Sequence, residues 1–242
     1  ATDLPYKDDL PKLPYFESSV PEKVKLPSLA DYLSRTKEEQ KDIYSLPSHT
    51  RQSIERGPYL EGFKSRGLGV LFLYEPVDEY VMGNLAQYDE KQLVSADTGD
   101  IKLDDTPKAD VEGALDEKQT EALCTWLKDT IGETIQEVKA SSRLVDSPAM
   151  ALNPDAMTSQ MRRMMRQMSP DQAPMPIKVN FEINPNHKLM INLNGQRESN
   201  PDLAKLVALQ TFDNALVAAN LMEDPKDMVA RMYDILEQAA DK

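Results

Sequence analysis

The sequence predicts an α/β chain, α+β overall, in which a small three-layer αβα unit precedes a mixed α/β unit that ends in a helical bundle. Three observations carry this prediction. Short apolar runs alternate with helical patterns over residues 28–105. An acidic, proline-containing join covers residues 97–115. Two strongly apolar helical patterns fill the chain from residue 199 onward.

Composition and charge exclude several classes of protein. The 242 residues carry a net charge of −13, whereas general nucleic-acid binding needs a basic face. No apolar run approaches the roughly 20 residues of a membrane span. With Cys124 as the one cysteine, no intrachain disulfide or cysteine metal cluster can form, and its possible partners His49 and His187 lie in polar, loop-like stretches. We therefore expect no metal, no nucleic-acid or membrane partner and no catalytic thiol.

The first unit is predicted over residues 28–105, after an extended lead-in at 1–27 whose five prolines block regular helix. We expect the lead-in to lie against a neighbouring domain. Alternating strands and helices with short connections favour a mostly parallel sheet covered by helices. The pattern predicts strands at 42–46, 70–74 and 91–96, the second of them buried on both faces. It predicts a helix capped by Ser28, a helix capped by Ser48 that ends near Gly57, a helix started by Pro58 and ended by Gly67, and a helix at 77–87.

One alternative for this unit is a small α/β enzyme with a site near residues 75–79. Glu75, Asp78 and Glu79 flank the end of a strand, where active sites often occur. No second group converges on them, and the sequence Gly67-Leu68-Gly69 lacks the third glycine of a dinucleotide-binding loop and precedes its strand. Acids favoured by the dipole at a helix N-terminus are the plainer interpretation.

The second unit is predicted over residues 106–242. A helix at 116–131 buries Leu123, Trp126 and Leu127, and Gly132 ends it. Further along, the pattern predicts strands at 135–141 and 149–153 around a turn at 146–148, a half-buried strand at 177–183 and a short helix near 187–194.

Residues 157–168, MTSQMRRMMRQM, predict an amphipathic helix with a thioether face and a cationic face. Five methionines recur at helical spacing, at Met157, Met161, Met164, Met165 and Met168, and three arginines point the other way. Core packing and an exposed binding face fit this pattern equally, because methionine is used for both. A helix that binds a membrane surface is a further alternative, although the rest of the chain is acidic.

The two terminal helices carry more apolar surface than one neighbour can cover. We therefore predict that they associate with a second copy as a four-helix bundle. The alternative is that they cover the sheet of their own unit. The residues predicted to form the dimer interface are Leu203, Leu206, Val207, Leu209, Phe212, Leu216 and Val217 in the first helix and Met228, Met232, Ile235 and Leu236 in the second.

Several long stretches are familiar, and they run in register from about Pro14 to Leu236. They are SLADYLSRTKEEQKDIYSL, VLFLYEPVDEYVMGNLAQYDEKQLVS, SSRLVDSPAM, FEINPNH and FDNALVAANLMEDPKDMVARMYDIL. These stretches closely resemble the ninety-kilodalton heat-shock chaperone family. The resemblance implies the end of that family's middle domain followed by its C-terminal dimerisation domain. It also implies that ATP and Mg²⁺ bind to an N-terminal domain outside this chain. The 242 residues themselves would then have no catalysis and no cofactor.

The resemblance further implies the partners. They are a second copy of the chain and client proteins, with the methionine face of residues 157–168 as the client-contacting surface. The chain ends in EQAADK without the MEEVD tail, so no helical-repeat co-chaperone is expected through that tail. The segment LPKLPYFESSVPE resembles mitochondrial members, which makes the mitochondrial matrix the first expectation and a bacterial cytoplasm the second.

Overall fold

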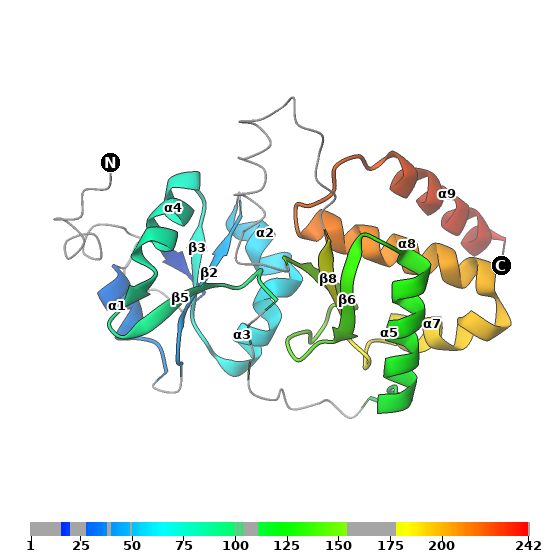
Figure 1. Ribbon diagram of the computed structural model, residues 1–242, viewed down its shortest axis with the longest axis horizontal. Helices are drawn as coiled ribbons and strands as arrows, with labels where there is room; N and C mark the ends of the chain where they lie inside the picture. Colours follow the sequence, from blue (N-terminus) through cyan, green and yellow to red (C-terminus); the bar gives the residue numbers. More distant parts are fainter. Residues whose placement is uncertain are drawn as a thin grey trace. The chain divides into compact units, whose positions relative to one another are not determined.

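The computed structural model describes residues 16–19, 28–37, 40–48, 50–99, 101, 103, 111–153 and 178–241 (Figure 1). The chain divides into two compact units, Ala1–Leu103 and Asp104–Lys242, which we call unit 1 and unit 2. The methionine segment 157–168 and His49 lie outside the described residues.

Unit 1 is built on a five-stranded sheet with the strand order β1-β3-β2-β5-β4. The inner strands are β2 (Ile43–Pro47), β3 (Val70–Leu73) and β5 (Lys91–Ser95), and β2 runs parallel to both of the others. At the two edges, β1 (Glu17–Ser18) and β4 (Gln87–Tyr88) pair in antiparallel fashion. All four residues of β3 are buried, as the non-alternating apolar run predicts.

Helices cover both faces of this sheet and make the predicted three layers (Figure 1). On one face, α1 (Leu29–Leu33) and α4 (Pro76–Leu85) form a core with alternate strand residues such as Ile43 and Leu71. On the other face, α2 (Arg51–Arg56), the 3-10 turn η3 (Pro58–Leu60) and α3 (Glu61–Arg66) bury aromatic side chains. There the rings of Tyr44 and Phe63 lie 4.7 Å apart.

The ends of these helices follow their capping residues, with one correction. Ser28 caps α1 by accepting from the Asp31 N–H, and Gly67 ends α3 in the left-handed conformation, at φ 65°. The predicted cap Ser48 does not start α2, because its N–H still donates to Leu73 O beside β3. Thr50 caps α2 instead, and its side chain accepts from the Ser53 N–H.

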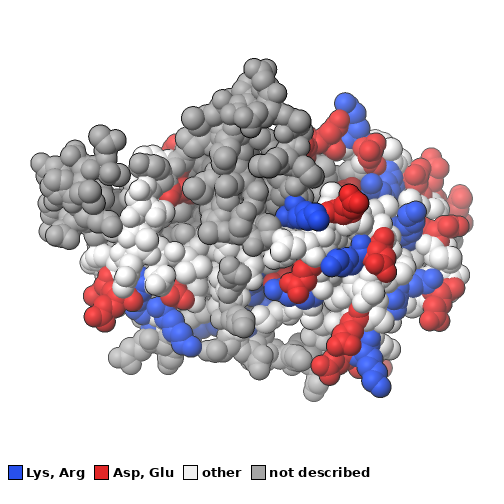
Figure 2. Space-filling model, viewed as in Figure 1, with Lys and Arg blue, Asp and Glu red and all other residues white. Residues whose placement is uncertain are grey.

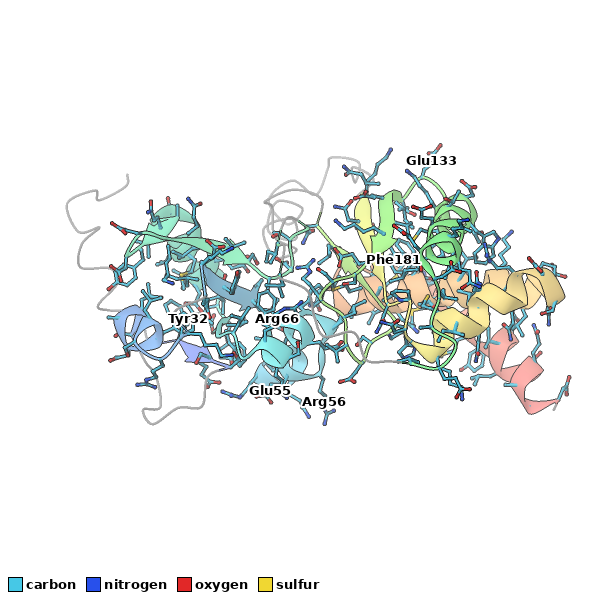
Figure 3. All side chains as sticks on the ribbon, turned by 90° about the horizontal axis from the view of Figure 1, so that it is seen from below. Tyr32, Glu55, Arg56, Arg66, Glu133 and Phe181 are labelled. Carbon is cyan, nitrogen blue, oxygen red and sulfur yellow. The ribbon has the colours of Figure 1, made fainter. Side chains whose placement is uncertain are left out.

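A buried polar cluster ties α1 to β2 and β3. The Tyr32 hydroxyl donates to Gly69 O at 2.6 Å (Tyr32 is labelled in Figure 3). The Gln40 amide donates to Tyr32 Oη at 3.0 Å, and Gln40 Oε1 accepts from the Gly69 N–H at 2.8 Å. Burial, the largest influence, raises the pKa of the Tyr32 phenol, so the phenol stays neutral and donates.

The described part of the lead-in, residues 16–19, belongs to unit 1, and its predicted contact with a neighbouring domain stays a prediction. The strand β1 pairs with β3, with Glu17 opposite Phe72. Phe16 is only 4% exposed and joins the core under α1 and α4. Beyond the strand, Ser19 exchanges hydrogen bonds with Val70 at 2.9 Å.

Unit 2 contains a three-stranded sheet with the order β6-β8-β7. The strands are β6 (Ile135–Ala140), β7 (Ala149–Leu152) and β8 (Val179–Ile183), and β8 runs parallel to β6 and antiparallel to β7. The sequence suggested a half-buried β8, but the strand is central and four of its five residues are buried. Its Glu182 carboxylate lies at 3.5 Å from the buried Arg143 guanidinium and accepts from the Ser141 hydroxyl.

Four helices of unit 2 are described. They are α5 (Glu117–Ile131), α7 (Lys188–Ser199), α8 (Pro201–Ala218) and α9 (Lys226–Ala240). Leu123 and Leu127 are fully buried and Gly132 follows at φ 88°, as predicted, whereas Trp126 is only half-buried. Asp116, the first residue of the predicted helix, is its cap and accepts from the Gln119 N–H. The helix α7 continues beyond the predicted end at residue 194, to Ser199. Arg197 in its last turn donates to Ala122 O and lies over the Trp126 ring of α5.

Candidate association surface on the terminal helices

The inner face of α8 fits the sheet of its own unit. Small residues recur along it, and Ala204 and Ala208 are fully buried. Their size lets the helix approach β7 and α5 closely. Further along the same face, the Phe212 ring meets the Phe181 ring of β8 edge-on, with centroids 5.3 Å apart (Phe181 is labelled in Figure 3).

The outer side of α8 carries α9. Arg231 of α9 donates to an Asp213 carboxylate oxygen at 2.5 Å, and the two side chains are only 15% and 18% exposed. An apolar groove runs between α7, α8 and α9, and its apolar lining includes Leu193, Leu203, Val207 and Ile235. The ion pair and the groove fix which side of α9 faces the unit.

The remaining side of α9 is an apolar stripe that faces solvent. Its members are Val229, Met232, Tyr233 and Leu236, which are 38%, 38%, 60% and 54% exposed. They recur at i, i+3, i+4 and i+7, so they form one face of the helix. No residue of α9 is buried, although the helix is strongly amphipathic. We call these four residues the α9 stripe.

The predicted interface residues divide into three groups in the structure. Phe212, which we expected at the interface, is 4% exposed and belongs to the core of unit 2 because the alanine face of α8 turns toward the sheet. Leu203, Val207 and Ile235 line the groove. The others are half-buried or exposed: Leu206, Leu209, Leu216, Val217, Met228, Met232 and Leu236. Sequence reasoning missed Tyr233, which the i+4 spacing from Val229 could have indicated.

The face of unit 2 seen in Figure 2 carries basic and acidic side chains that are interspersed. The net charge of −13 is therefore not gathered into one acidic patch on that face. Among the residues that the structure describes, no group of three or more His, Cys, Asp or Glu could hold a metal ion. No described helix is long and apolar enough to cross a membrane.

Two of the three carboxylates near residues 75–79, those of Glu75 and Asp78, cap the start of α4, and Glu79 is buried. An Asp78 carboxylate oxygen accepts from the N–H groups of Tyr74 and Glu75, at 3.2 and 3.1 Å. This is the capping arrangement expected of acids at a helix N-terminus.

Cys124 is buried on α5. Burial, with a smaller contribution from Glu121, raises the pKa of its thiol to about 11. The sulfur is therefore a neutral thiol near neutral pH and a poor nucleophile.

Comparison with known proteins gives the family. The family model described as Hsp90 protein matches residues 1–242, the whole chain. The chain belongs to the Hsp90 family.

The curated relatives of this Hsp90-family chain come from bacteria and from mitochondria. A Chaperone protein HtpG of Desulfitobacterium hafniense is 42% identical over 240 residues, which cover 99% of this chain and 39% of the relative. The mitochondrial Heat shock protein 75 kDa of Rattus norvegicus is 35% identical over 245 residues, which cover 98% and 34%. The mitochondrial TNF receptor-associated protein 1 homolog of Dictyostelium discoideum is 33% identical over 245 residues, which cover 100% and 34%.

The Hsp90-family chain thus spans between about a third and two fifths of the length of these relatives. Bacterial and mitochondrial proteins both occur among them. The preference for the mitochondrial branch stays a prediction, since the bacterial protein is more identical than the mitochondrial one, at 42% against 35%.

Proposed function

We propose that this Hsp90-family chain is the dimerising and client-contacting part of a longer ATP-dependent chaperone. The single observation that carries the proposal is the α9 stripe, an apolar helix face for which the described residues of unit 2 offer no cover. Stripes of this kind are buried when two copies associate about a two-fold axis. The half-buried apolar residues of α8, such as Leu206 and Leu209, extend the same surface.

The client-contacting part of the proposal rests on residues 157–168. Their methionine face would bind many apolar partners weakly, because methionine adapts its shape and apolar burial has no direction. Two such faces in one dimer would raise the effective concentration of each for a client held by the other. Weak contacts of this kind suit a chaperone that must also release its client.

We assign no nucleotide chemistry to this chain. ATP binding and hydrolysis belong, in this proposal, to parts of the chaperone outside the 242 residues, and no cofactor is held here. The family relatives are about two and a half times longer or more, which leaves room for such parts.

Dimerisation is tested by placing charge on the α9 stripe. Met232→Glu with Leu236→Glu should convert dimers to monomers at micromolar concentration, because two desolvated carboxylates in an apolar interface cost several kcal/mol. Analytical ultracentrifugation gives the mass. Ala230→Glu, at an exposed position of α9 outside the stripe, is the control and should leave the dimer intact. A double variant that remains a dimer would place the interface elsewhere.

Client contact is tested on the methionine segment. Met161→Glu with Met165→Glu should abolish suppression of aggregation of a heat-denatured test protein, because the apolar face is interrupted, while the dimer persists. Light scattering follows the aggregation. Thr158→Glu with Ser159→Glu adds the same charge to polar positions of the segment and should keep the suppression. Equal suppression by both double variants would remove the methionine face from the mechanism.

A further inference from the structure

Among the strands that the structure describes, β6 is an edge strand of unit 2. Among the described strands, β6 pairs only with β8, so its other side carries backbone groups that no described strand takes up. Ala140 lies opposite Ile183, and the Ser141 N–H donates to Ile183 O at 2.8 Å. In a parallel ladder, alternate residues direct their peptide groups to the neighbour. Lys139 and Ser141 therefore bond to β8, and Val138 and Ala140 direct their N–H and C=O groups outward.

A hollow of about 730 Å³ lies along this free side. Its apolar walls come from the turn before α5, from α5 itself and from β6: Val111, Ala114, Leu115, Cys124, Val138 and Ala140. Val138 and Ala140 share a face of the sheet with their partners Phe181 and Ile183, the face that meets α8. The volume is sufficient for a large apolar side chain or a small ligand.

The hollow reaches the strand edge itself. Lys139 is among its lining residues, although the Lys139 ammonium lies on the other face of the sheet, 3.7 Å from the Glu182 carboxylate. Its contribution to the hollow therefore comes from the part of the residue nearest the backbone. The outward peptide groups of β6 and the apolar hollow thus lie side by side. One added strand could bond to the peptide groups and place a side chain in the hollow.

The rim of the hollow is acidic. Glu117 and Glu121 line it from α5, and both residues are exposed. The one basic lining residue, Lys139, already has carboxylate neighbours in Glu182 and Glu137. A ligand that brings positive charge beside an apolar group therefore complements the rim.

We propose that the outer edge of β6 and its hollow bind an extended peptide segment of a partner protein, in which apolar and basic residues alternate. The segment would add a strand beside Val138 and Ala140, place one apolar side chain in the hollow and bring basic side chains to Glu117 and Glu121. The site lies on unit 2 and does not use the α9 stripe or residues 157–168.

A second copy of β6 fits this edge less well than a peptide does. A register shift between Ile135 and Glu137 interrupts regular pairing in the first half of the strand. The pairing stretch that remains is short, and a copy would bring an acidic chain of net charge −13 to an acidic rim. Short pairing with a basic segment gives weak and sequence-tolerant binding.

The probe for the test is a fluorescein-labelled heptapeptide of sequence Lys-Val-Lys-Phe-Lys-Val-Lys, added to the full 242-residue chain. Fluorescence anisotropy measures its affinity. The same peptide with Glu in place of Lys is the charge control. We expect saturable binding of the basic peptide and none of the acidic one. Equal binding of both peptides, or of neither, would overturn the proposal.

Cys124 provides a readout located in the hollow. It is the single cysteine of the chain and lines the hollow, and burial raises the pKa of its thiol to about 11. Labelling by a maleimide at a pH of about 9 is therefore slow. Bound basic peptide should slow it further. Protection that depends on chain concentration without peptide would instead show a second copy at the edge and would contradict the proposal.

Two variants separate the backbone contribution from the charge contribution. Ala140→Pro removes one outward N–H without touching the ladder to β8, a place where an edge strand tolerates proline, and should weaken the peptide about fivefold. Glu117→Lys with Glu121→Lys should weaken it about tenfold or more. Asp129→Lys with Glu133→Lys makes the same charge change in the last turn of α5 and just beyond it, and should leave affinity unchanged.

The outcomes are distinct from those of the dimer test. If Ala140→Pro does not fold, the rim variant (Glu117→Lys with Glu121→Lys) and its matched control (Asp129→Lys with Glu133→Lys) test the proposal without it. Wild-type affinity in the rim variant would overturn the proposal. The Met232→Glu, Leu236→Glu chain should bind the basic peptide as the unchanged chain does, since the two surfaces share no residue.

Discussion

At the scale of single residues, the two cores are ordered by a few buried polar groups. Gln40 is 1% exposed, yet its amide holds the Tyr32 hydroxyl and both its oxygen and its nitrogen serve the backbone near Gly69 and Asp42. The sequence could place Tyr32 on the buried face of its helix from spacing alone. It could not reveal Gln40, because the partners of a buried amide lie far along the chain.

Removing the Gln40 amide should destabilise unit 1. Gln40→Leu leaves the Gly69 N–H buried without its acceptor and should lower the free energy of unfolding by about 2–3 kcal/mol. Urea denaturation followed by tyrosine fluorescence measures this change. Gln92→Leu, the same substitution at an exposed position of β5, should change stability by less than about 0.5 kcal/mol. A loss no larger than that of the control would show that water replaces the amide.

At the scale of elements, capping and periodicity predicted where several of the helices begin or end. The burial of a strand depended on its place in the sheet order. Ser28, Gly67 and Gly132 end or start helices as their local chemistry requires. The strand β8 alternates apolar and polar residues, which is typical of one solvated face. It is nevertheless central, and Glu182 is buried against Arg143, because the order β6-β8-β7 depends on pairing between distant segments.

The helix α8 also shows what the sequence could not predict. Its apolar residues surround the helix, so the sequence could not tell which face meets the sheet. The alanines decide it, since only a side chain of that size fits between α8 and the sheet. Phe212 belongs to that inner face and leaves the predicted interface, whereas Leu206 and Leu209 remain outside the core.

Enlarging the inner face of α8 should therefore destabilise unit 2. Ala208→Leu adds three carbons at a fully buried position and should cost about 1–3 kcal/mol through overpacking. Thermal unfolding by circular dichroism measures the loss. Ala218→Leu, at an exposed position of the same helix, serves as the comparison and should leave the melting temperature nearly unchanged. If both variants have the same melting temperature, the space beside Ala208 can accommodate the larger side chain.

At the scale of the whole molecule, charge and apolar surface act against each other. The chain carries a net charge of −13, so two copies repel each other at long range, while the α9 stripe favours their association at contact. Composition gave the charge directly. The location of the stripe needed the structure, because residues such as Ile235 and Leu236 are neighbours in sequence and only one of them lines the groove.

Salt should accordingly strengthen the proposed dimer. Raising the salt concentration from about 20 mM to about 500 mM shortens the screening length to a few ångströms and should lower the dissociation constant several-fold. Sedimentation equilibrium at the two concentrations measures it. Uncharged osmolyte at matched osmolarity is the control. A dimer that dissociates as salt rises would instead depend on ion pairs between copies.

The two-residue strand β1 has a practical consequence for anyone who isolates unit 1. A piece cut at residue 28, where the first helix is about to begin, would discard Phe16 from the core and expose the β3 edge that Glu17 and Ser18 cover. Uncovered strand edges of this kind recruit other chains, so the shortened piece would be recovered as aggregate. A piece that begins ahead of Phe16 keeps its own edge protected and gives soluble material for the measurements above.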